Sequence, residues 1–257
     1  MASAVASLQG ASGNERFNAE AAAWDQNPFV HEASKEAANA IIQRFSKLEI
    51  SGPHQTLDVL EIGCGTGLLS LQLAPFVRTL VAIDAAQGMI DVLTKKLQGA
   101  DAPKNVLPLC VLLEDPEDRV LPPATSGDND GPRMKFDLIL SHLVLHHIPD
   151  LEGVLKTMLG RLNPGGSVAL TDFEDFGPEA RRFHPKAKMA GVERHGIGQE
   201  TMTALIQQVG FKNVRVERAF AMMKQVETIE GEFGSQRPAP GQGEVMNFPF
   251  LVCMGER

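Results

Sequence analysis

The stretch "LEIGCGTGLL" (60–69) decides the fold, because it joins an apolar run to a segment with helical spacing. Three glycines, Gly63, Gly65 and Gly67, and one cysteine, Cys64, lie at the junction. Glycine lets a backbone turn tightly from strand to helix and lets a ligand approach without a Cβ in its path. Such a turn could cradle the pyrophosphate of a dinucleotide, present a redox cysteine, or dock another nucleoside.

Two acidic residues favour the third of these readings. The dinucleotide fingerprint is GxGxxG, whereas the spacing here is Glu61-x-Gly63-x-Gly65-x-Gly67. A carboxylate at the turn repels a pyrophosphate but suits a cationic or hydroxyl-rich ligand. Asp84 ends the next apolar run, where a carboxylate can accept hydrogen bonds from both hydroxyls of a ribose. The sequence therefore favours an adenosine that carries a sulfonium over one that carries phosphates.

Apolar runs alternate with helical segments along the first two thirds of the chain. Five runs are apolar almost throughout, as strands buried on both faces should be: 57–63, 79–84, 106–113, 136–143 and 166–173. Segments with helical spacing lie at 67–77, 86–99 and 150–162. The alternation predicts an α/β, Rossmann-like fold in which helices cover both faces of a mostly parallel sheet.

The pattern changes in the last third of the chain, which predicts antiparallel strands at one edge of the sheet. Residues 174–199 lack clean periodicity, and a helix is predicted over 200–210. Two β-like runs follow, 211–223 and 248–256, with no helical pattern between them. Since consecutive strands without a connecting helix pair antiparallel, we predict a seven-stranded sheet that ends in an antiparallel C-terminal hairpin.

Bulk composition narrows the classes of function. The 257 residues, 43% of them hydrophobic, can bury one substantial core, and we expect a single domain over 14–257 after a disordered tail, 1–13. The net charge of −8 argues against a nucleic-acid partner, and no apolar run reaches the roughly 18 residues of a membrane span. Three scattered cysteines and no signal-peptide pattern favour the cytoplasm. The oligomeric state stays open, and a monomer is compatible with the sequence.

The glycine turn belongs to a larger resemblance. "VLEIGCGTG" (59–67), "VAID" (81–84) and "FDLILSHLVLHHIPD" (136–150) resemble the signature segments of class I S-adenosylmethionine-dependent methyltransferases. The resemblance covers about 14–257 and implies S-adenosyl-L-methionine as cofactor. The site that it implies comprises Trp24, Asp25, Glu61, Gly63, Gly65, Gly67, Asp84, Met89, Leu113, Glu114, Ser141 and His142.

Several of these positions also have plainer readings. Leu113 and Glu114 end the third strand, where the family contacts adenine, although this acidic stretch also suits a solvated loop. Met89 could cover adenine or pack in the core. Ser141 and His142 face the methionine part of the cofactor by analogy with the family.

A closer resemblance points to the acceptor. "AAAWDQNPFV" (21–30), "DFGPEARRFHP" (175–185), "GVERHGI" (191–197) and the ending "FPFLVCMGE" (248–256) are similar to fungal dithiol S-methyltransferases, which methylate reduced gliotoxin. The resemblance implies a lid over the cofactor that carries Trp24 and Asp25. It also implies a substrate cap over 174–199, and the expected substrate-binding residues are Phe176, Phe183, His184 and His195.

The expected reaction is in-line methyl transfer to a small-molecule thiol. Since a thiol with a pKa of about 8.5 is partly ionised near neutrality, no dedicated base is expected. His184 and His195 are the weak candidates. His146 and His147 look like half of a metal site, but adjacent residues do not share a helical face and no further ligand stands at ligand spacing, so no metal is expected.

Rival functions keep part of this reading. O-, N- or C-methylation of another small metabolite, such as a ubiquinone-type ring, would use the same cofactor site. A nicotinamide dehydrogenase is disfavoured by the missing GxGxxG. A non-catalytic nucleoside-binding protein is disfavoured because the motif is intact.

Overall fold

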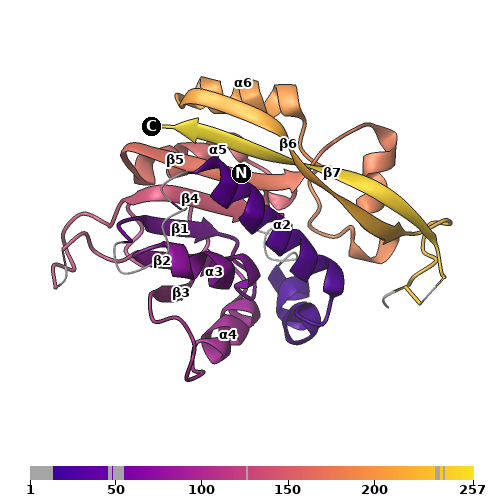
Figure 1. Cartoon of the computed structure of the whole chain (residues 1–257), viewed down its shortest axis with the longest axis horizontal. Helices are drawn as coiled ribbons and strands as arrows, with labels where there is room; N and C mark the ends of the chain where they lie inside the picture. Colours follow the sequence, from indigo (N-terminus) through magenta and orange to yellow (C-terminus); the bar gives the residue numbers. More distant parts are fainter. Residues whose placement is uncertain (1–13, 46–47, 49–54, 126, 235–237, 240) are drawn as a thin grey trace, which may run out of the picture.

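The computed structural model describes residues 14–45, 48, 55–125, 127–234, 238–239 and 241–257. The predicted tail, 1–13, lies outside the described residues. Seven strands form one sheet in the order β3-β2-β1-β4-β5-β7-β6 (Figure 1). Their bounds are β1 Asp58–Ile62, β2 Thr79–Asp84, β3 Val106–Cys110, β4 Phe136–His142, β5 Leu162–Phe173, β6 Lys212–Val226 and β7 Glu244–Glu256.

The pairing confirms the predicted topology. β1 pairs in parallel with β2 and β4, and β2–β3 and β4–β5 are parallel as well. β7 runs antiparallel to both of its neighbours, β5 and β6, so the chain inserts its last strand into the sheet. Every residue of β1 is buried, as expected for a central strand covered on both faces.

Helices cover both faces of the sheet, as predicted. On one face, α2 (Pro28–Arg44), α3 (Leu68–Leu73) and α4 (Gln87–Lys96) bury apolar side chains against alternate strand residues such as Val59. On the other face, α5 (Leu151–Arg161) and α6 (Gln199–Val209) pack against the intervening residues, such as Leu60. A further helix spans residues 14–24.

Several predicted boundaries need correction, and β5 and β7 each begin four residues earlier than predicted, at Leu162 and Glu244. The predicted strand 106–113 ends at Cys110, and the remaining residues continue without regular structure. The predicted helix 67–77 splits into α3 and a 3₁₀ turn, η2 (Ala74–Phe76), because Pro75 has no amide hydrogen to continue an α-helix. β6 extends three residues beyond the predicted run, to Val226.

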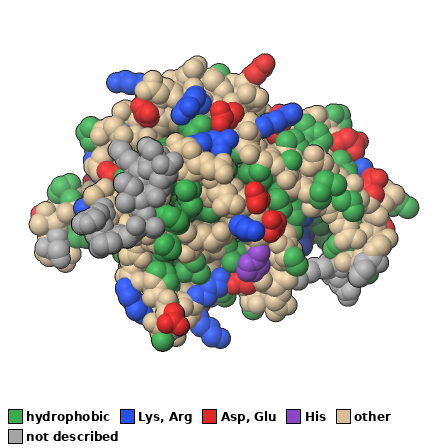
Figure 2. All heavy atoms as spheres, in the orientation of Figure 1, with side chains coloured by type: hydrophobic (Ala, Val, Ile, Leu, Met, Phe, Trp, Pro, Cys, Tyr) green, Lys and Arg blue, Asp and Glu red, His purple; other side chains and the backbone are tan. Residues whose placement is uncertain are grey.

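Charged side chains of both signs are mixed on the surface. On the face drawn in Figure 2, acidic and basic side chains of the described residues are interspersed and form no continuous basic stripe. Among the described residues, no helix is long and apolar enough to cross a membrane.

Candidate functional site

A cavity of about 810 Å³ opens at the carboxyl ends of β1, β2 and β4. The carboxyl edge of an open α/β sheet is where such folds bind ligands, and this volume is typical of small-molecule sites. Its walls come from the glycine turn, the N-terminal helices, the loop after β4, the segment 183–193 and the far end of β6.

The glycine turn is shaped by three left-handed residues. Gly63, Gly65 and Gly67 have φ values of 71°, 53° and 79°. A Cβ on Gly63 would come within 2.4 Å of Val144, and one on Gly67 would meet Leu93 at the same distance. A Cβ on Gly65 would meet nothing within 4 Å. Packing therefore requires glycine at positions 63 and 67, whereas Gly65 borders open space. Gly63 and Gly65 line the cavity, and Gly67 does not.

Asp84 holds the turn in place. One carboxylate oxygen accepts a 2.8 Å hydrogen bond from the amide of Gly65, and the other accepts one of 2.8 Å from the amide of Ala86. Burial raises the pKa of Asp84, although these two amides oppose the shift. A carboxylate has about four acceptor positions, and the described residues occupy two of those of Asp84, which lines the cavity.

Glu61 is the second acid at the turn and is 2% exposed. Burial raises its pKa to about 8, and nearby Asp84 adds to the shift. Its carboxyl group accepts a hydrogen bond from the Ser70 hydroxyl at 2.5 Å. Glu61 therefore lines the cavity as a mostly protonated acid at neutral pH. Cys64 is also buried, and burial raises the pKa of its thiol, which suits a packing role better than a nucleophilic one.

The residues expected around adenine lie together. Met89, Leu113 and Glu114 all line the cavity. Met89 is 2% exposed and belongs to a small apolar cluster with Trp24. Core packing and a contact with a ligand are thus compatible at Met89.

The N-terminal segment closes one side of the cavity. Trp24 lines it, half-buried, with its ring edge-on to Phe17 at 5.9 Å between centroids. Asp25 lies outside the lining. Its carboxylate accepts a hydrogen bond from Thr66 at 2.5 Å and forms an ion pair with Lys96 at 2.5 Å. Asp25 thus ties this segment to the glycine turn and to α4.

The last two residues of β4, Ser141 and His142, divide in the same way. Ser141 is fully buried outside the lining, and its hydroxyl donates to the carbonyl of Ile62 at 3.0 Å. His142 lines the cavity, with Nδ1 2.8 Å from the Thr171 hydroxyl. Burial lowers the pKa of His142 to about 4, so its ring is neutral.

The irregular segment brings two of the four expected substrate residues to the cavity. Phe183 and His184 line it, whereas Phe176 and His195 do not. Phe183 stacks on Phe173 at 3.9 Å, and Phe176 packs edge-on to Phe248.

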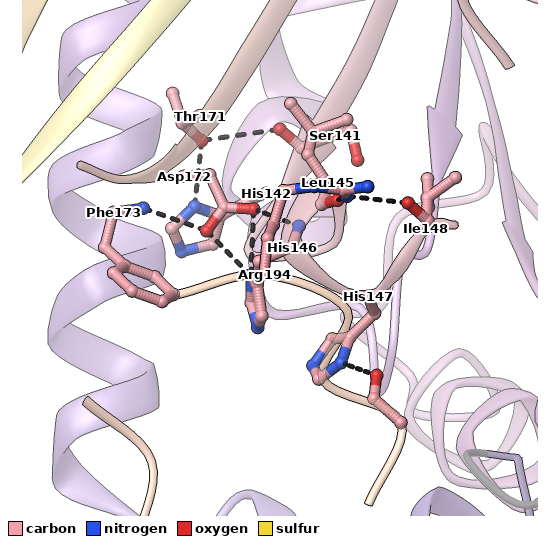
Figure 3. A network of polar contacts seen from close by, with 11 residues as sticks. Ser141, His142, Leu145, His146, His147, Ile148, Thr171, Asp172, Phe173 and Arg194 are labelled. Carbon is pink, nitrogen blue, oxygen red and sulfur yellow. Dashed lines mark hydrogen bonds and ion pairs between the residues drawn. The ribbon is translucent and has the colours of Figure 1, made fainter. Parts of the chain in front are cut away.

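The structure also places a group that sequence spacing missed. His146 is 1% exposed, and its Nδ1 lies 2.8 and 2.9 Å from the two carboxylate oxygens of Asp172 (Figure 3). His146, His147 and His184 each offer a ring nitrogen, and these nitrogens lie within 4.8 Å of one another. The third histidine comes from far along the chain. The available signal in the sequence was Asp172, an acid near the end of a predicted strand.

Lys224 was missed as well. Its ammonium lies 4.2 Å from the centroid of the Phe29 ring and 4.9 Å from that of Phe183, at the wall of the cavity. Burial lowers the pKa of Lys224 to about 8, with a smaller contribution from Lys188. Lys224 lies one residue beyond the predicted strand 211–223, within the extension of β6, so no sequence pattern marked it.

Comparisons with known proteins agree with this geometry. A family described as a methyltransferase domain matches residues 29–216. An uncharacterized methyltransferase, C1347.09 of Schizosaccharomyces pombe, is 29% identical over 62% of this chain and 55% of its own length. A ubiquinone biosynthesis O-methyltransferase of Bartonella tribocorum is 34% identical over 44% of this chain and 40% of its own length. The chain thus spans little more than half the length of the first of these relatives.

Solved structures share the fold at low identity. YcgJ of Bacillus subtilis superposes with a TM-score of 0.60 at 16% identity, over 86% of this chain and 97% of its own. A possible histamine N-methyltransferase of Thermotoga maritima, described as S-adenosylmethionine-dependent, gives 0.55 at 17% identity, over 93% and 97%. With nearly three quarters of its residues matched by one family, this chain belongs to the methyltransferase domain family.

Proposed function

We propose that this chain transfers the methyl group of S-adenosyl-L-methionine to a thiol of a small molecule, with a dithiol such as reduced gliotoxin as the favoured acceptor. Membership of the methyltransferase domain family supports the reaction and the methyl donor. The thiol rests on the resemblance to dithiol S-methyltransferases and on the chemistry of the cavity wall.

The cofactor would lie along the glycine turn. The free acceptor positions of Asp84 suit the two ribose hydroxyls, and Gly65 leaves room for the ligand to approach the backbone. Met89 and Leu113 offer apolar contacts to the adenine. Glu61 would lie near the positively charged methionine part of the cofactor. A nearby positive charge lowers the pKa of a carboxyl group, so Glu61 would lose its proton when the cofactor binds. The segment with Trp24 and Asp25 would then cover the cofactor as a lid, held in place by the contacts of Asp25 with Thr66 and Lys96.

The wall of the cavity where the methyl acceptor would bind supports a thiol as the acceptor. Its wall combines aromatic rings, such as Phe183, with imidazoles held neutral by burial, namely His142 and His147. When a thiolate attacks a sulfonium, two opposite charges disappear. A weakly polar cavity therefore favours the reaction, because it stabilises the separated charges of the reactants less than water does.

The reaction needs little from the protein besides orientation and exclusion of water. The thiol releases its proton to solvent, and its sulfur forms a bond to the methyl carbon as the bond from that carbon to the sulfonium breaks. The products are a thioether and S-adenosylhomocysteine. Burial holds the pKa of His184 well below its usual value, which makes it a weak base, and His195 lies outside the lining. We infer that neither is required as a base, and that 174–199 serves as a substrate cap.

A phenolic hydroxyl is the second candidate acceptor. The relative from Bartonella tribocorum is named an O-methyltransferase, and His146 with Asp172 forms a dyad at the cavity that could accept a phenolic proton. A phenol with a pKa of about 10 is far less ionised than a thiol at neutral pH, so it would need such a base.

Mass spectrometry separates these acceptors. The chain is incubated with S-adenosyl-L-methionine and either reduced gliotoxin, a simple monothiol or a catechol, and the products are scanned for one and two added methyl groups. We expect double methylation of the dithiol and slower or no methylation of the catechol. Methylation of the catechol alone would favour a phenol over a thiol as the acceptor. If no S-adenosylhomocysteine forms with either acceptor class, both proposals are rejected.

A further inference from the structure

We propose that His146, His147 and His184 bind a divalent transition-metal ion of the zinc type, with a fourth coordination position open toward the cavity. His146 and His147 lie on the 3₁₀ turn η3 (Leu145–His147), directly after β4, and His184 follows η4 (Pro178–Phe183). All three side chains line the cavity, and their centroids lie 4.0 to 5.8 Å apart. Three imidazoles with one open position is the ligand set of a catalytic zinc site.

Hydrogen bonds at Nδ1 leave Nε2 of two of the rings available for a metal ion. Asp172 is fully buried, and its two carboxylate oxygens lie 2.8 and 2.9 Å from Nδ1 of His146. When the carboxylate of Asp172 accepts a hydrogen bond from Nδ1–H of His146, Nε2 of His146 carries the lone pair. That Nε2 is buried and, among the described residues, has no hydrogen-bond partner. An unpaired buried nitrogen of this kind calls for a ligand.

His147 has the same arrangement through the backbone. Its Nδ1 lies 2.6 Å from the carbonyl oxygen of Gly191, which can only accept a hydrogen bond, so Nε2 is again the free nitrogen (Figure 3). A carboxylate on one ring and a carbonyl on the next are the two partners that usually orient histidine ligands of metals.

The distances require a small closure. A tetrahedral ion with metal–nitrogen bonds of about 2.0–2.1 Å holds its ligands roughly 3.3 Å apart. The three nitrogens lie within 4.8 Å of one another, so they must approach by at most about 1.5 Å. His184 lies in a segment without helix or strand at that position, where such a shift is easiest. No buried carboxylate is added to the set, so a hard ion such as Mg²⁺ fits poorly.

Metal titration tests the site without any catalytic assay. The full chain, free of affinity-tag histidines and treated with a chelator, is titrated with Zn²⁺ in a calorimeter and with Co²⁺ in an absorption spectrometer. We expect one ion per chain and the intense visible bands of tetrahedral Co²⁺. His184→Ala and His147→Ala should each weaken Zn²⁺ binding at least 100-fold, and Asp172→Asn, which keeps the shape of the side chain, about 10–100-fold.

Matched controls distinguish this site from incidental binding. His31→Ala removes an exposed imidazole elsewhere, and Cys110→Ser removes an exposed thiol; both should bind Zn²⁺ as the original chain does. Circular dichroism of each variant confirms folding, and His184, at the cavity wall, is the variant least expected to disturb it. Absence of one-to-one binding by the original chain, or unchanged affinity in folded His184→Ala, would overturn the proposal.

Discussion

Asp84 accepts a hydrogen bond from the amide of Gly65 across 2.8 Å, so the residue at the end of β2 fixes the glycine turn that follows β1. The same carboxylate therefore has two roles, one in shaping the turn and one toward the proposed ribose. The sequence marked both residues as ligand contacts but did not show that they contact each other.

Removal of the Asp84 carboxylate should weaken cofactor binding strongly. Two hydrogen bonds to a charged carboxylate contribute about 1.5–3 kcal/mol each, so Asp84→Ala should bind S-adenosyl-L-methionine tenfold to several thousandfold more weakly. Calorimetry measures the affinity, and thermal unfolding without cofactor measures the loss of the turn. Asp84→Asn is the matched control for shape. Unchanged affinity in folded Asp84→Ala would remove Asp84 from the cofactor site.

Two glycines of the turn should respond differently to alanine. Gly63→Ala places a Cβ 2.4 Å from Val144, so we expect a clear drop in melting temperature. Gly65→Ala meets no protein atom but projects into the cavity, so its cofactor affinity should fall while stability decreases only by the roughly 1–2 kcal/mol cost of a left-handed residue. Gly165→Ala, also left-handed and unobstructed, is the control that should keep full affinity.

Cofactor binding should release a proton from Glu61. Its pKa is about 8 in the free protein, so it is mostly protonated at pH 7, and a cationic ligand favours the ionised form. The binding enthalpy at pH 7 should therefore differ between two buffers with different ionisation enthalpies, by an amount that corresponds to up to one proton per cofactor. Glu61→Gln should remove the difference. Equal enthalpies for the original chain in both buffers would contradict this.

The fold was readable from the sequence because its strongest signals are local. The central strands β1, β2 and β4 are buried almost throughout and so are apolar, and the glycine turn marks where the first of them meets a helix. The edge strand β3 was predicted to be buried on both faces, but Leu107 is 40% exposed. α2 was missed, although Asn27 caps its first turn and Pro28 opens it, which is a usual start signal. The end of β3 was placed too late because the apolar run continues beyond the last residue that pairs with β2.

The sequence could predict site residues only where a polar side chain lies at the end of a recognisable strand. Glu61 and Asp84 were found because each lies at the carboxyl edge of a predicted strand. His146 and His184 come together through tertiary packing, since β4 and β5 lie side by side and the segment after β5 folds back over both. No spacing rule along the chain could show that contact.

The fluorescence of Trp24 should report closure of the proposed lid. It is the chain's only tryptophan, and its half-buried ring borders the cavity and packs near Met89. Titration with S-adenosyl-L-methionine should shift or quench its emission in a saturable manner, with a midpoint equal to the calorimetric dissociation constant. If calorimetry shows binding but the fluorescence does not change, Trp24 does not cover the cofactor and only packs against its neighbours.

Burial of His142 should make the cofactor-free protein sensitive to mild acid. The folded pKa of His142 is about 4, below the 6.5 of an exposed histidine, so between these values the unfolded chain holds more protons than the folded one. The corresponding stability is therefore fully present above pH 6.5 and is lost as the pH falls toward 4. One pH unit corresponds to about 1.4 kcal/mol, so the full loss is on the order of 3 kcal/mol.

Urea unfolding of the original chain and of His142→Gln, at intervals from pH 7.5 to 4.5, isolates this contribution. Glutamine does not titrate in this range, and effects of all other groups cancel in the difference between the two proteins at each pH. We expect the variant to be less stable at pH 7.5, because it disturbs the contact with Thr171, and to lose less stability on acidification. The two stability curves should therefore converge toward pH 4.5. Parallel curves would mean that His142 takes up its proton as readily in the folded protein as in the unfolded chain.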